Sequence, residues 1–301
     1  MSRIHEALKK AEQERAASRA AQLENTGSAA DLMLEHPVAG AEGAAVAIAP
    51  SLASAFTYDA LLARCNQSQW NPDRSTMLFF NPQENARGME QFRTLRSRLY
   101  HIRENRALTK LLICSPLQQE GKSFVSANLA QVLVRQRGRR VLLIDADLRE
   151  PTLHHFLGAE RSPGLSEYLA GQSDEFGVIQ RGPMENLFFV AAGQQHSTPA
   201  ELVANGRLKL FLSHVESLFD WVLIDSPPAV PVSDASLLAN FCDGVLLVVR
   251  SNVTPFDVAR KARLEFRDKQ LIGVVLNAVA ENSTYSQYYE SRYGQNQAQG
   301  N

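Results

Sequence analysis

Short, continuous apolar runs recur along the chain between residues 110 and 277. Six of these runs occupy residues 110–114, 141–145, 187–191, 221–225, 245–249 and 271–277. Continuous apolar runs are typical of strands covered on both faces, so each run predicts a buried strand. Helical patterns lie between several of them. One follows Lys122, carries Val125, Leu129 and Val132, and stops near Gly138. The alternation predicts an α/β fold with a doubly wound, mainly parallel sheet.

Four segments of the chain differ in composition. Residues 1–20 have Ile4 and Leu8 at helical spacing, which predicts an amphipathic helix that either stays solvated or docks on a partner. Residues 21–75 are rich in small and polar residues, which predicts a flexible linker. Residues 76–280 carry the strand and helix signals of the folded domain. Residues 281–301 have no aliphatic side chain larger than Ala, which predicts a disordered tail.

Composition narrows the class of protein. The chain has 301 residues, a formal net charge of −1 and three cysteines that are far apart. This charge gives no electrostatic reason to expect a nucleic acid or an anionic membrane as partner. The cysteines are expected to be buried thiols in a reducing compartment. No apolar run approaches the ~20 residues of a membrane span, and the N-terminus lacks the apolar core of a secretion signal. We therefore expect a cytoplasmic protein.

The stretch CSPLQQEGKSF, residues 114–124, has the context of a phosphate-binding loop because it follows a predicted strand and opens a predicted helix. Backbone amides of residues 119–123 and the helix dipole would hold phosphate oxygens. Lys122 would reach the β- and γ-phosphates, and Ser123 would contact Mg²⁺. The position of the usual first glycine holds Pro116, which fixes φ and donates no hydrogen bond. On its own, a Gly-Lys-Ser triplet on a loop can also arise by chance.

Acidic residues follow two other predicted strands. Asp145 and Asp147 suit a divalent metal and a proton acceptor, and Arg149 could steady a phosphate or a carboxylate. The alternative is an ordinary polar turn. Asp225 ends the predicted strand 221–225 and is followed by Pro227 and a second proline. In P-loop enzymes an acidic residue at the end of such a strand orients the water shell of Mg²⁺, and Asp225 fits that role. The carboxyl ends of parallel strands share one edge, so these loops are expected to meet there.

Together these motifs resemble the bacterial tyrosine kinases of capsule and exopolysaccharide synthesis. The resemblance rests on Gly121-Lys122-Ser123, Asp145-x-Asp147-x-Arg149 and Asp225-x-Pro-Pro, and it extends to GLSEYLAG (164–171) and STPAELV (197–203). An E-x-x-R-x-x-R helix matches at Glu90, Arg93 and Arg96. The similarity covers about residues 76–293. It implies a P-loop NTPase fold of the partitioning and septum-site ATPase type, with ATP and Mg²⁺ as cofactors.

The resemblance also implies roles for single residues. Lys122, Asp145, Asp147 and Asp225 would be catalytic, with Asp145 receiving the tyrosine proton and with Ser123, Asp147 and Asp225 at the metal. The implied nucleotide-binding residues are Gln119, Glu120, Gly121, Lys122, Ser123, Phe124, Arg149 and Asn277. Related loops commonly carry Pro-Gly before Glu-Gly-Lys, whereas this chain has Gln118-Gln119. This departure puts the affinity for ATP, and with it catalysis, in question.

Four of the seven tyrosines fall within nine residues of the polar tail: Tyr285, Tyr288, Tyr289 and Tyr293. They are the expected phosphate acceptors, although a tail without function would have the same composition. Phosphorylation in trans requires contact between subunits, so Glu90, Arg93 and Arg96 are expected at the interface of a ring-like homo-oligomer. Pairing within their own helix is the alternative. A separate membrane-embedded activator is the expected partner, and it would recruit the protein to the inner face of the membrane.

Three functions fit these features to different extents. A tyrosine autokinase regulating polysaccharide synthesis or export accounts for the three loops and for the tyrosine cluster. A partitioning-type ATPase switch accounts for the loops alone. A nucleotide-binding scaffold without kinase activity would account for the altered first half of the phosphate loop.

Overall fold

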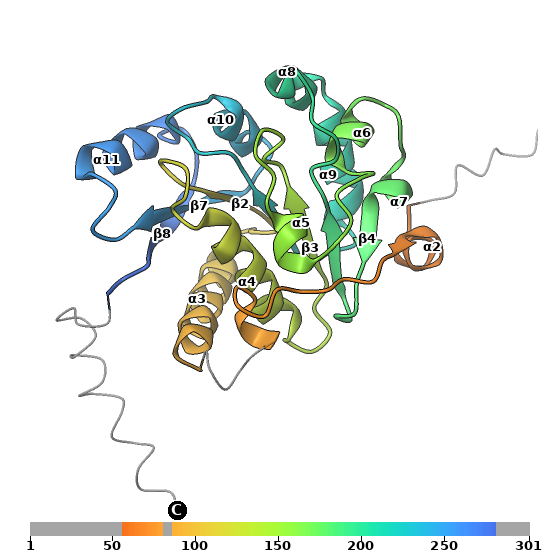
Figure 1. Cartoon of the computed structure of the whole chain (residues 1–301), viewed down its shortest axis with the longest axis horizontal. Coiled ribbons are helices and arrows are strands. Elements are labelled where there is room, and N and C mark those ends of the chain that lie inside the picture. Colours follow the sequence, from red (N-terminus) through yellow and green to blue (C-terminus); the bar gives the residue numbers. More distant parts are fainter. Residues whose placement is uncertain (1–55, 81–85, 281–301) are drawn as a thin grey trace, which may run out of the picture. The chain divides into compact units, whose positions relative to one another are not determined.

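The computed structural model describes residues 56–80 and 86–280. These residues form one eight-stranded sheet in the order β1-β4-β5-β3-β6-β2-β7-β8 (Figure 1). All neighbouring strands run parallel except β4 and β5, which are antiparallel. The strands are β1 (Asn66–Gln67), β2 (Lys110–Cys114), β3 (Val141–Asp145), β4 (Ile179–Arg181), β5 (Leu187–Val190), β6 (Trp221–Asp225), β7 (Gly244–Arg250) and β8 (Leu271–Asn277). The doubly wound, mainly parallel sheet is therefore confirmed.

Helices cover both faces of the sheet and build two apolar cores. One face packs against η1 (Leu78–Phe80), α3 (Ala86–Asn105), α4 (Lys122–Val134) and α5 (Leu153–Leu157). The other packs against α2 (Tyr58–Arg64), α6 (Leu165–Leu169), α7 (Glu175–Val178), α8 (Pro199–Ala204), α9 (Arg207–Glu216), α10 (Asp234–Ala239) and α11 (Phe256–Glu265). Every residue of β3 and β6 is buried, as the continuous apolar runs predict.

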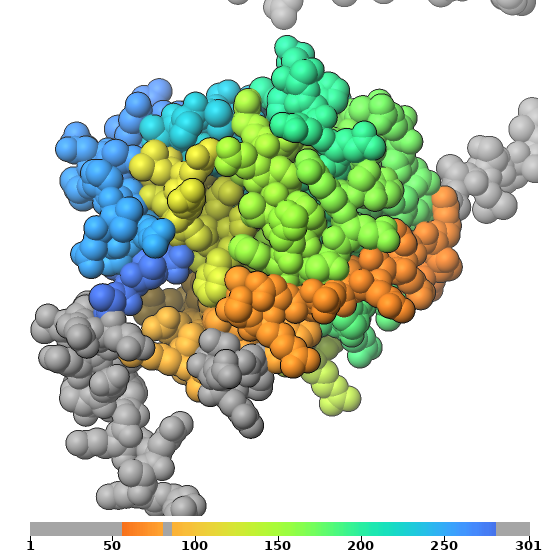
Figure 2. Space-filling view, viewed as in Figure 1, coloured from red at the N-terminus to blue at the C-terminus, as the bar shows by residue number. Residues whose placement is uncertain are grey.

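The start of the folded region differs from the prediction of a linker up to residue 75. Residues 58–64 form helix α2, and β1 pairs with β4 at the edge of the sheet. Leu61 and Trp70 are buried, and together with the helix N-cap Thr57 they explain why this polar segment is ordered. In Figure 2 these residues, in orange, run across one face of the molecule. The linker prediction is thus wrong for residues 56–75.

Other predicted segments lie outside the described residues: the N-terminal helix (1–20), linker residues 21–55 and the tail (281–301). The three cysteines are free; Cys65 and Cys114 are buried, and Cys242 is half-buried. No helix among residues 56–80 and 86–280 is long and apolar enough to cross a bilayer.

Candidate functional site

The predicted phosphate loop joins β2 to α4, in the middle of the sheet. Gly121 is the N-cap of α4 and has φ +90°, a left-handed conformation that glycine adopts without strain. A Cβ atom at this position would lie 2.1 Å from the side-chain amide nitrogen of Asn277. Glycine is therefore required here for two reasons, backbone conformation and space. Gln119 also has a positive φ, of 60°, so the loop turns at this residue instead of at a first glycine.

Contacts within the loop and from the neighbouring strand ends hold it in the absence of that glycine. The Ser115 hydroxyl donates to the carbonyl of Leu117 at 2.6 Å, and the Leu117 amide donates to the Glu120 carboxylate at 3.1 Å. The Thr254 hydroxyl donates to the other oxygen of the same carboxylate. Burial raises the pKa of Glu120, although the bond from Thr254 opposes this effect. Pro116 is thus accommodated by a carboxylate that bridges the loop and the segment after β7.

Two further side chains bind the loop from the ends of β7 and β8. The Arg250 guanidinium donates to the carbonyl of Gln119 at 3.1 Å, and the Asn277 amide donates to the carbonyl of Glu120 at 2.9 Å. Asn277 therefore contacts the phosphate loop directly. Sequence reasoning missed Arg250 and Thr254, although Arg250 ends an apolar strand in the same way as Asp145 and Asp225.

Three carboxylates lie next to the loop at the ends of the central strands. Asp145 and Asp225 are register partners on adjacent strands β3 and β6. Lys122 Nζ forms an ion pair with Asp147 at 3.0 Å, while Asp225 accepts hydrogen bonds from Ser123 at 2.6 Å and Ser126 at 2.9 Å. The structure therefore brings together the predicted lysine, serine and acidic residues.

Within this cluster the charges of the buried carboxylates keep Lys122 protonated, while burial raises the pKa of Asp145. Burial alone would lower the pKa of Lys122, but the carboxylates of Asp225 and Asp147 outweigh it and raise that pKa above its usual value. Asp145 is fully buried and accepts only backbone N–H groups, from Asp147 at 3.2 Å and Leu153 at 3.1 Å. Burial, followed by the charges of Asp225 and Asp147, raises the pKa of Asp145 well above its ordinary value. A raised pKa suits a carboxylate that accepts a proton.

The residues present fit a nucleotide-bound magnesium ion better than a metal held by protein alone. Among the described residues, no three His, Cys, Asp or Glu side chains converge as a metal site. Magnesium usually takes one or two carboxylates, with substrate phosphates and waters completing its ligands. The adjacent oxygens of Ser123 and Asp225 offer that incomplete set.

Other predicted site residues have different neighbours. Arg149 forms a two-point ion pair with the buried Asp234, at 2.8 and 3.1 Å, which joins the loop after β3 to the start of α10. The Phe124 ring packs edge-on against Phe92 of α3, with centroids 6.0 Å apart.

The E-x-x-R-x-x-R residues lie on α3. Glu90 and Arg93 form an ion pair within the helix at 2.9 Å, and both are exposed. Arg96 donates to the carbonyl of Val132 at 3.1 Å, so it binds the last turn of α4. Pairing within the helix thus occurs for two of the three residues. An intersubunit role remains a prediction for all three.

The GLSEYLAG motif positions a loop at the same edge of the sheet, which the sequence did not reveal. The Glu167 carboxylate accepts hydrogen bonds from the Ser162 hydroxyl at 2.6 Å and from the amides of Gly164 at 2.8 Å and Gln194 at 3.1 Å. These donors lie before α6 and after β5. The motif thus fastens the loop that follows β5.

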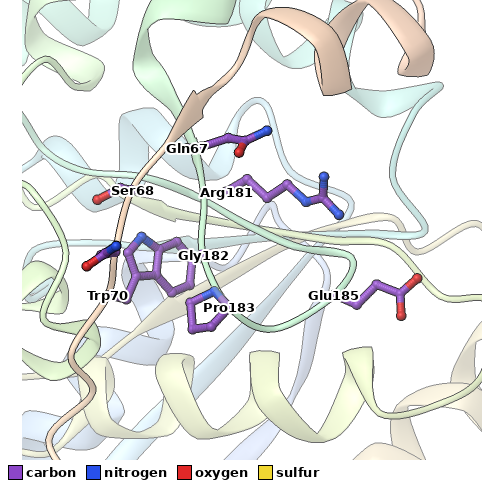
Figure 3. Close-up of a pocket in the computed structure, with 8 residues that line it drawn as sticks. Gln67, Ser68, Trp70, Arg181, Gly182, Pro183 and Glu185 are labelled. Carbon is purple, nitrogen blue, oxygen red and sulfur yellow. The ribbon is translucent and has the colours of Figure 1, made fainter.

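A separate cavity of about 690 Å³ lies away from the phosphate loop, between the segment after β1 and the turn that connects β4 to β5 (Figure 3). Strand β4 is antiparallel to β5 and pairs its last residue, Arg181, with Phe188 near the start of β5. The Trp70 ring lies against Gly182, where a Cβ atom would come within 2.2 Å. In Figure 3 the charged ends of Arg181 and Glu185 point away from that ring. The polar groups of this cavity do not converge on one point.

A glycine-capped loop with Gly-Lys-Ser between a central parallel strand and a helix, facing buried acids, defines a P-loop nucleotide-binding domain. Residues 111–299 match the family described as CobQ/CobB/MinD/ParA nucleotide binding domain. The chain belongs to this family, and within it to the P-loop domains of the bacterial tyrosine kinases.

Two relatives and one solved structure support this assignment. The chain is 34% identical to the tyrosine-protein kinase YwqD of Bacillus subtilis over 203 residues. This match covers 66% of this chain and 85% of YwqD. It is 38% identical over 208 residues to the putative tyrosine-protein kinase EpsB of Ralstonia solanacearum, which covers 68% of this chain and 28% of EpsB. The chain thus matches under a third of EpsB. The kinase domain of the Escherichia coli tyrosine kinase ETK superimposes with a TM-score of 0.62 at 32% identity, covering 65% of this chain and 77% of that domain.

Proposed function

We propose that the protein is an ATP-dependent tyrosine autokinase that regulates exopolysaccharide or capsule synthesis or export. The observation that carries this proposal is the position of Lys122, at the start of α4 and 3.0 Å from Asp147, beside Asp145 and Asp225. Homology to tyrosine-protein kinases supports phosphoryl transfer as the reaction. The tyrosine cluster at the C-terminus supports the chain itself as substrate.

Each residue of the loop has a proposed task toward Mg-ATP. The backbone amides of residues 119–123 and the Lys122 ammonium bind the phosphates, for which Lys122 must leave Asp147. Ser123, Asp147 and Asp225 hold the magnesium ion, which when bound neutralises charge on the phosphates. Asn277, which contacts the loop at Glu120, is proposed beside the adenine. Arg149 acts through Asp234 by keeping the adjacent loops in place.

The proposed proton acceptor is Asp145. A tyrosine hydroxyl has a pKa near 10 and is a weak nucleophile until its proton is accepted. The phenolic oxygen bonds to the γ-phosphorus while the bond between that phosphorus and the β–γ bridging oxygen breaks. The proton passes to Asp145, and ADP leaves. Positioning and charge neutralisation supply most of the acceleration in such transfers.

The proposed acceptors are Tyr285, Tyr288, Tyr289 and Tyr293, all outside the described residues. We propose that one subunit phosphorylates the tail of another, within a homo-oligomer that uses Glu90, Arg93 and Arg96. A membrane-embedded activator is the proposed second partner, and it would hold the protein at the inner face of the membrane. Each added phosphate brings about −1.5 to −2 charges, which would make tails repel one another.

The test is to incubate the purified protein with Mg-ATP, with and without a candidate activator fragment, and to map phosphate by mass spectrometry. Phosphotyrosine at residues 285–293 should appear in the parent and be absent from Lys122→Met and Asp145→Asn. The exposed Lys261→Met, on α11, is the matched control and should behave like the parent. A mixture of Lys122→Met with a variant whose four tail tyrosines are Phe tests transfer between subunits. Phosphate on the Lys122→Met tail in that mixture indicates transfer in trans.

The same experiment separates the alternatives. The match to the nucleotide-binding family that includes MinD and ParA keeps an ATPase switch as a second candidate. Release of free phosphate without phosphotyrosine would support that switch. Absence of both products, with the activator present, would support a scaffold.

A further inference from the structure

Helix α4 directs two serine hydroxyls at the same carboxylate. Ser123 donates to Oδ2 of Asp225 at 2.6 Å, and Ser126 donates to Oδ1 at 2.9 Å. Residues three apart in a helix lie on the same side, and α4 packs against β6, the strand that Asp225 ends. The phosphate loop accounts for Ser123, but Ser126 lies one turn further along the helix, beyond the loop.

Ser126 is a polar side chain in an apolar part of the molecule. It is fully buried, and its neighbours along the helix, Val125, Ala127 and Leu129, belong to the core on this face of the sheet. Serine is a weaker helix former than alanine, and burying a hydroxyl is unfavourable unless it is hydrogen-bonded. Ser126 therefore adds no stability to the helix as such, and its presence has to be explained by the contacts of its hydroxyl.

The Ser126 hydroxyl has one proton and two acceptors at the same distance. The carbonyl of Lys122 and Oδ1 of Asp225 are both 2.9 Å from its oxygen. In an α-helix the carbonyl of residue 122 already accepts the backbone N–H of residue 126. A hydrogen bond to a carboxylate is also about twice as strong as one between neutral groups. Donation to Asp225 is therefore favoured over bonding back to the helix, which is the alternative for a helical serine.

The neighbouring lysine shows what the two serines prevent. Lys122 Nζ pairs with Asp147 at 3.0 Å and also lies 3.5 Å from the Ser123 hydroxyl oxygen, which is bound to Asp225. The last torsion of an aspartate side chain is soft, so a carboxylate held on one oxygen only could turn towards this ammonium. With one serine on each oxygen, the rotation of the Asp225 carboxylate is fixed.

We propose that Ser126 is a positioning residue that fixes the Asp225 carboxylate for the magnesium ion of a bound Mg-nucleotide, a role that rests on the proposed place of Asp225 at the metal. Its hydroxyl holds Oδ1, which leaves Oδ2 beside the Ser123 hydroxyl, and these two oxygens are the ones that fit magnesium. Ser126 touches neither the ion nor the nucleotide and acts through Asp225. Without its hydroxyl, the carboxylate keeps the hydrogen bond from Ser123 and can turn towards Lys122.

Nucleotide binding with and without magnesium tests this role on the full-length protein and needs no kinase reaction. The Kd for ADP is measured by isothermal titration calorimetry, once with EDTA and once with excess Mg²⁺, and the ratio of the two values is the gain from magnesium. Ser126→Ala should lower this gain about fivefold or more, because a hydrogen bond to a charged group is lost. The Kd measured with EDTA should stay close to that of the parent.

Further variants separate the hydroxyl from its surroundings. Ser126→Thr keeps the hydroxyl and should keep most of the gain from magnesium. Ser126→Cys keeps the shape but offers a weak donor, so it should lose part of the gain. Ser236→Ala, on α10, is the matched control, because it removes a buried helical hydroxyl that has no hydrogen-bond partner among the described residues. It should leave the gain unchanged.

An unchanged gain in Ser126→Ala, with a native melting temperature, would overturn the proposal. Equal weakening of ADP binding with EDTA and with Mg²⁺ would also overturn it, because Ser126 would then support the shape of the loop and not the metal site. A parent protein that gains nothing from magnesium would overturn both this proposal and the proposed magnesium site. Phosphotyrosine is measured separately, so failure of the kinase proposal leaves the result for Ser126 intact.

Discussion

Strands β6 and β8 have similar sequences and opposite surroundings. Both are continuous apolar runs that end in a polar residue, Asp225 in β6 and Asn277 in β8. All of β6 is buried between β3 and β2, whereas Val274 and Leu276 of β8 are more than half exposed. An apolar run therefore predicts a strand, while the neighbouring strands and helices decide whether it is buried. Burial at the centre raises the pKa of Asp145, whereas the outer strand leaves apolar side chains exposed to solvent.

The largest expected effect contrasts a lysine at the centre with one at the edge. Lys122→Met should lower tyrosine phosphorylation about 10³-fold or more, because the cation that pairs with Asp147 and is proposed to bind the phosphates is lost. Lys261→Met, exposed on α11, should stay within about twofold of the parent. Initial rates of phosphate incorporation measure both. Equal losses of phosphorylation rate in Lys122→Met and Lys261→Met would contradict the proposal that catalysis depends on the residues at the centre of the sheet.

Removing a leucine side chain from each strand tests burial itself. Leu223→Ala on β6, where the side chain is fully buried, should lower the free energy of unfolding by about 2–5 kcal/mol through a cavity. Leu276→Ala on β8 should lower it by less than about 1 kcal/mol, because water already reaches that side chain. Urea denaturation with a common m-value provides both numbers. A loss at Leu276 as large as that at Leu223 would mean that β8 is covered in solution.

Burial behind the central loops also predicts a pH dependence. His154, on α5, is buried and stacks on the exposed His155 with ring centroids 3.9 Å apart. Burial, then the neighbouring His155 and Arg161, lowers the pKa of His154 to about 4. Between about pH 6.5 and pH 4 the unfolded chain therefore binds more protons, and stability falls as the pH falls. The expected loss from this group is about 1–2 kcal/mol.

His154→Gln should remove that part of the acid-induced loss, while His155→Gln, at the exposed neighbour, should retain most of it. Denaturation midpoints measured at pH 7, 5.5 and 4.5 supply the comparison. Parallel pH profiles for the parent and His154→Gln would show that this histidine protonates as freely in the folded state as in the unfolded chain.

The smallest expected effect comes from a contact that joins the two regions. Thr254→Val removes the hydroxyl that binds Glu120 and should raise the KM for ATP about fivefold, equivalent to about 1 kcal/mol, with kcat little changed. Thr198→Val, at an exposed threonine before α8, is the control. An unchanged KM would show that the loop keeps its shape without this bridge.

Much of the fold follows from the sequence because the central strands are long apolar runs with helices between them. The three loops were expected at one edge for the same reason. Strands β1 and β4 have two and three residues, too few for any periodicity to be visible. The segment 56–75 was misread because its average composition is polar, although Leu61 and Trp70 anchor it.

The pairing of side chains within the site could not be predicted. Glu120 and Thr254 are 134 residues apart in sequence, and Arg149 and Asp234 are 85 apart. Such pairs depend on how the strand ends are arranged in space. The sequence identified the Lys122 loop and the acids facing it, but not that Lys122 would pair with Asp147 rather than Asp225.

The hydrogen bond from Asn277 to the carbonyl of Glu120 has a mechanical consequence. Strand β8 is held by one neighbour only, so it can peel from the sheet without dividing it. Three residues separate Asn277 from the beginning of the tail. A force applied to the chain after β8 would therefore reach Asn277 first and act on the phosphate loop at Glu120.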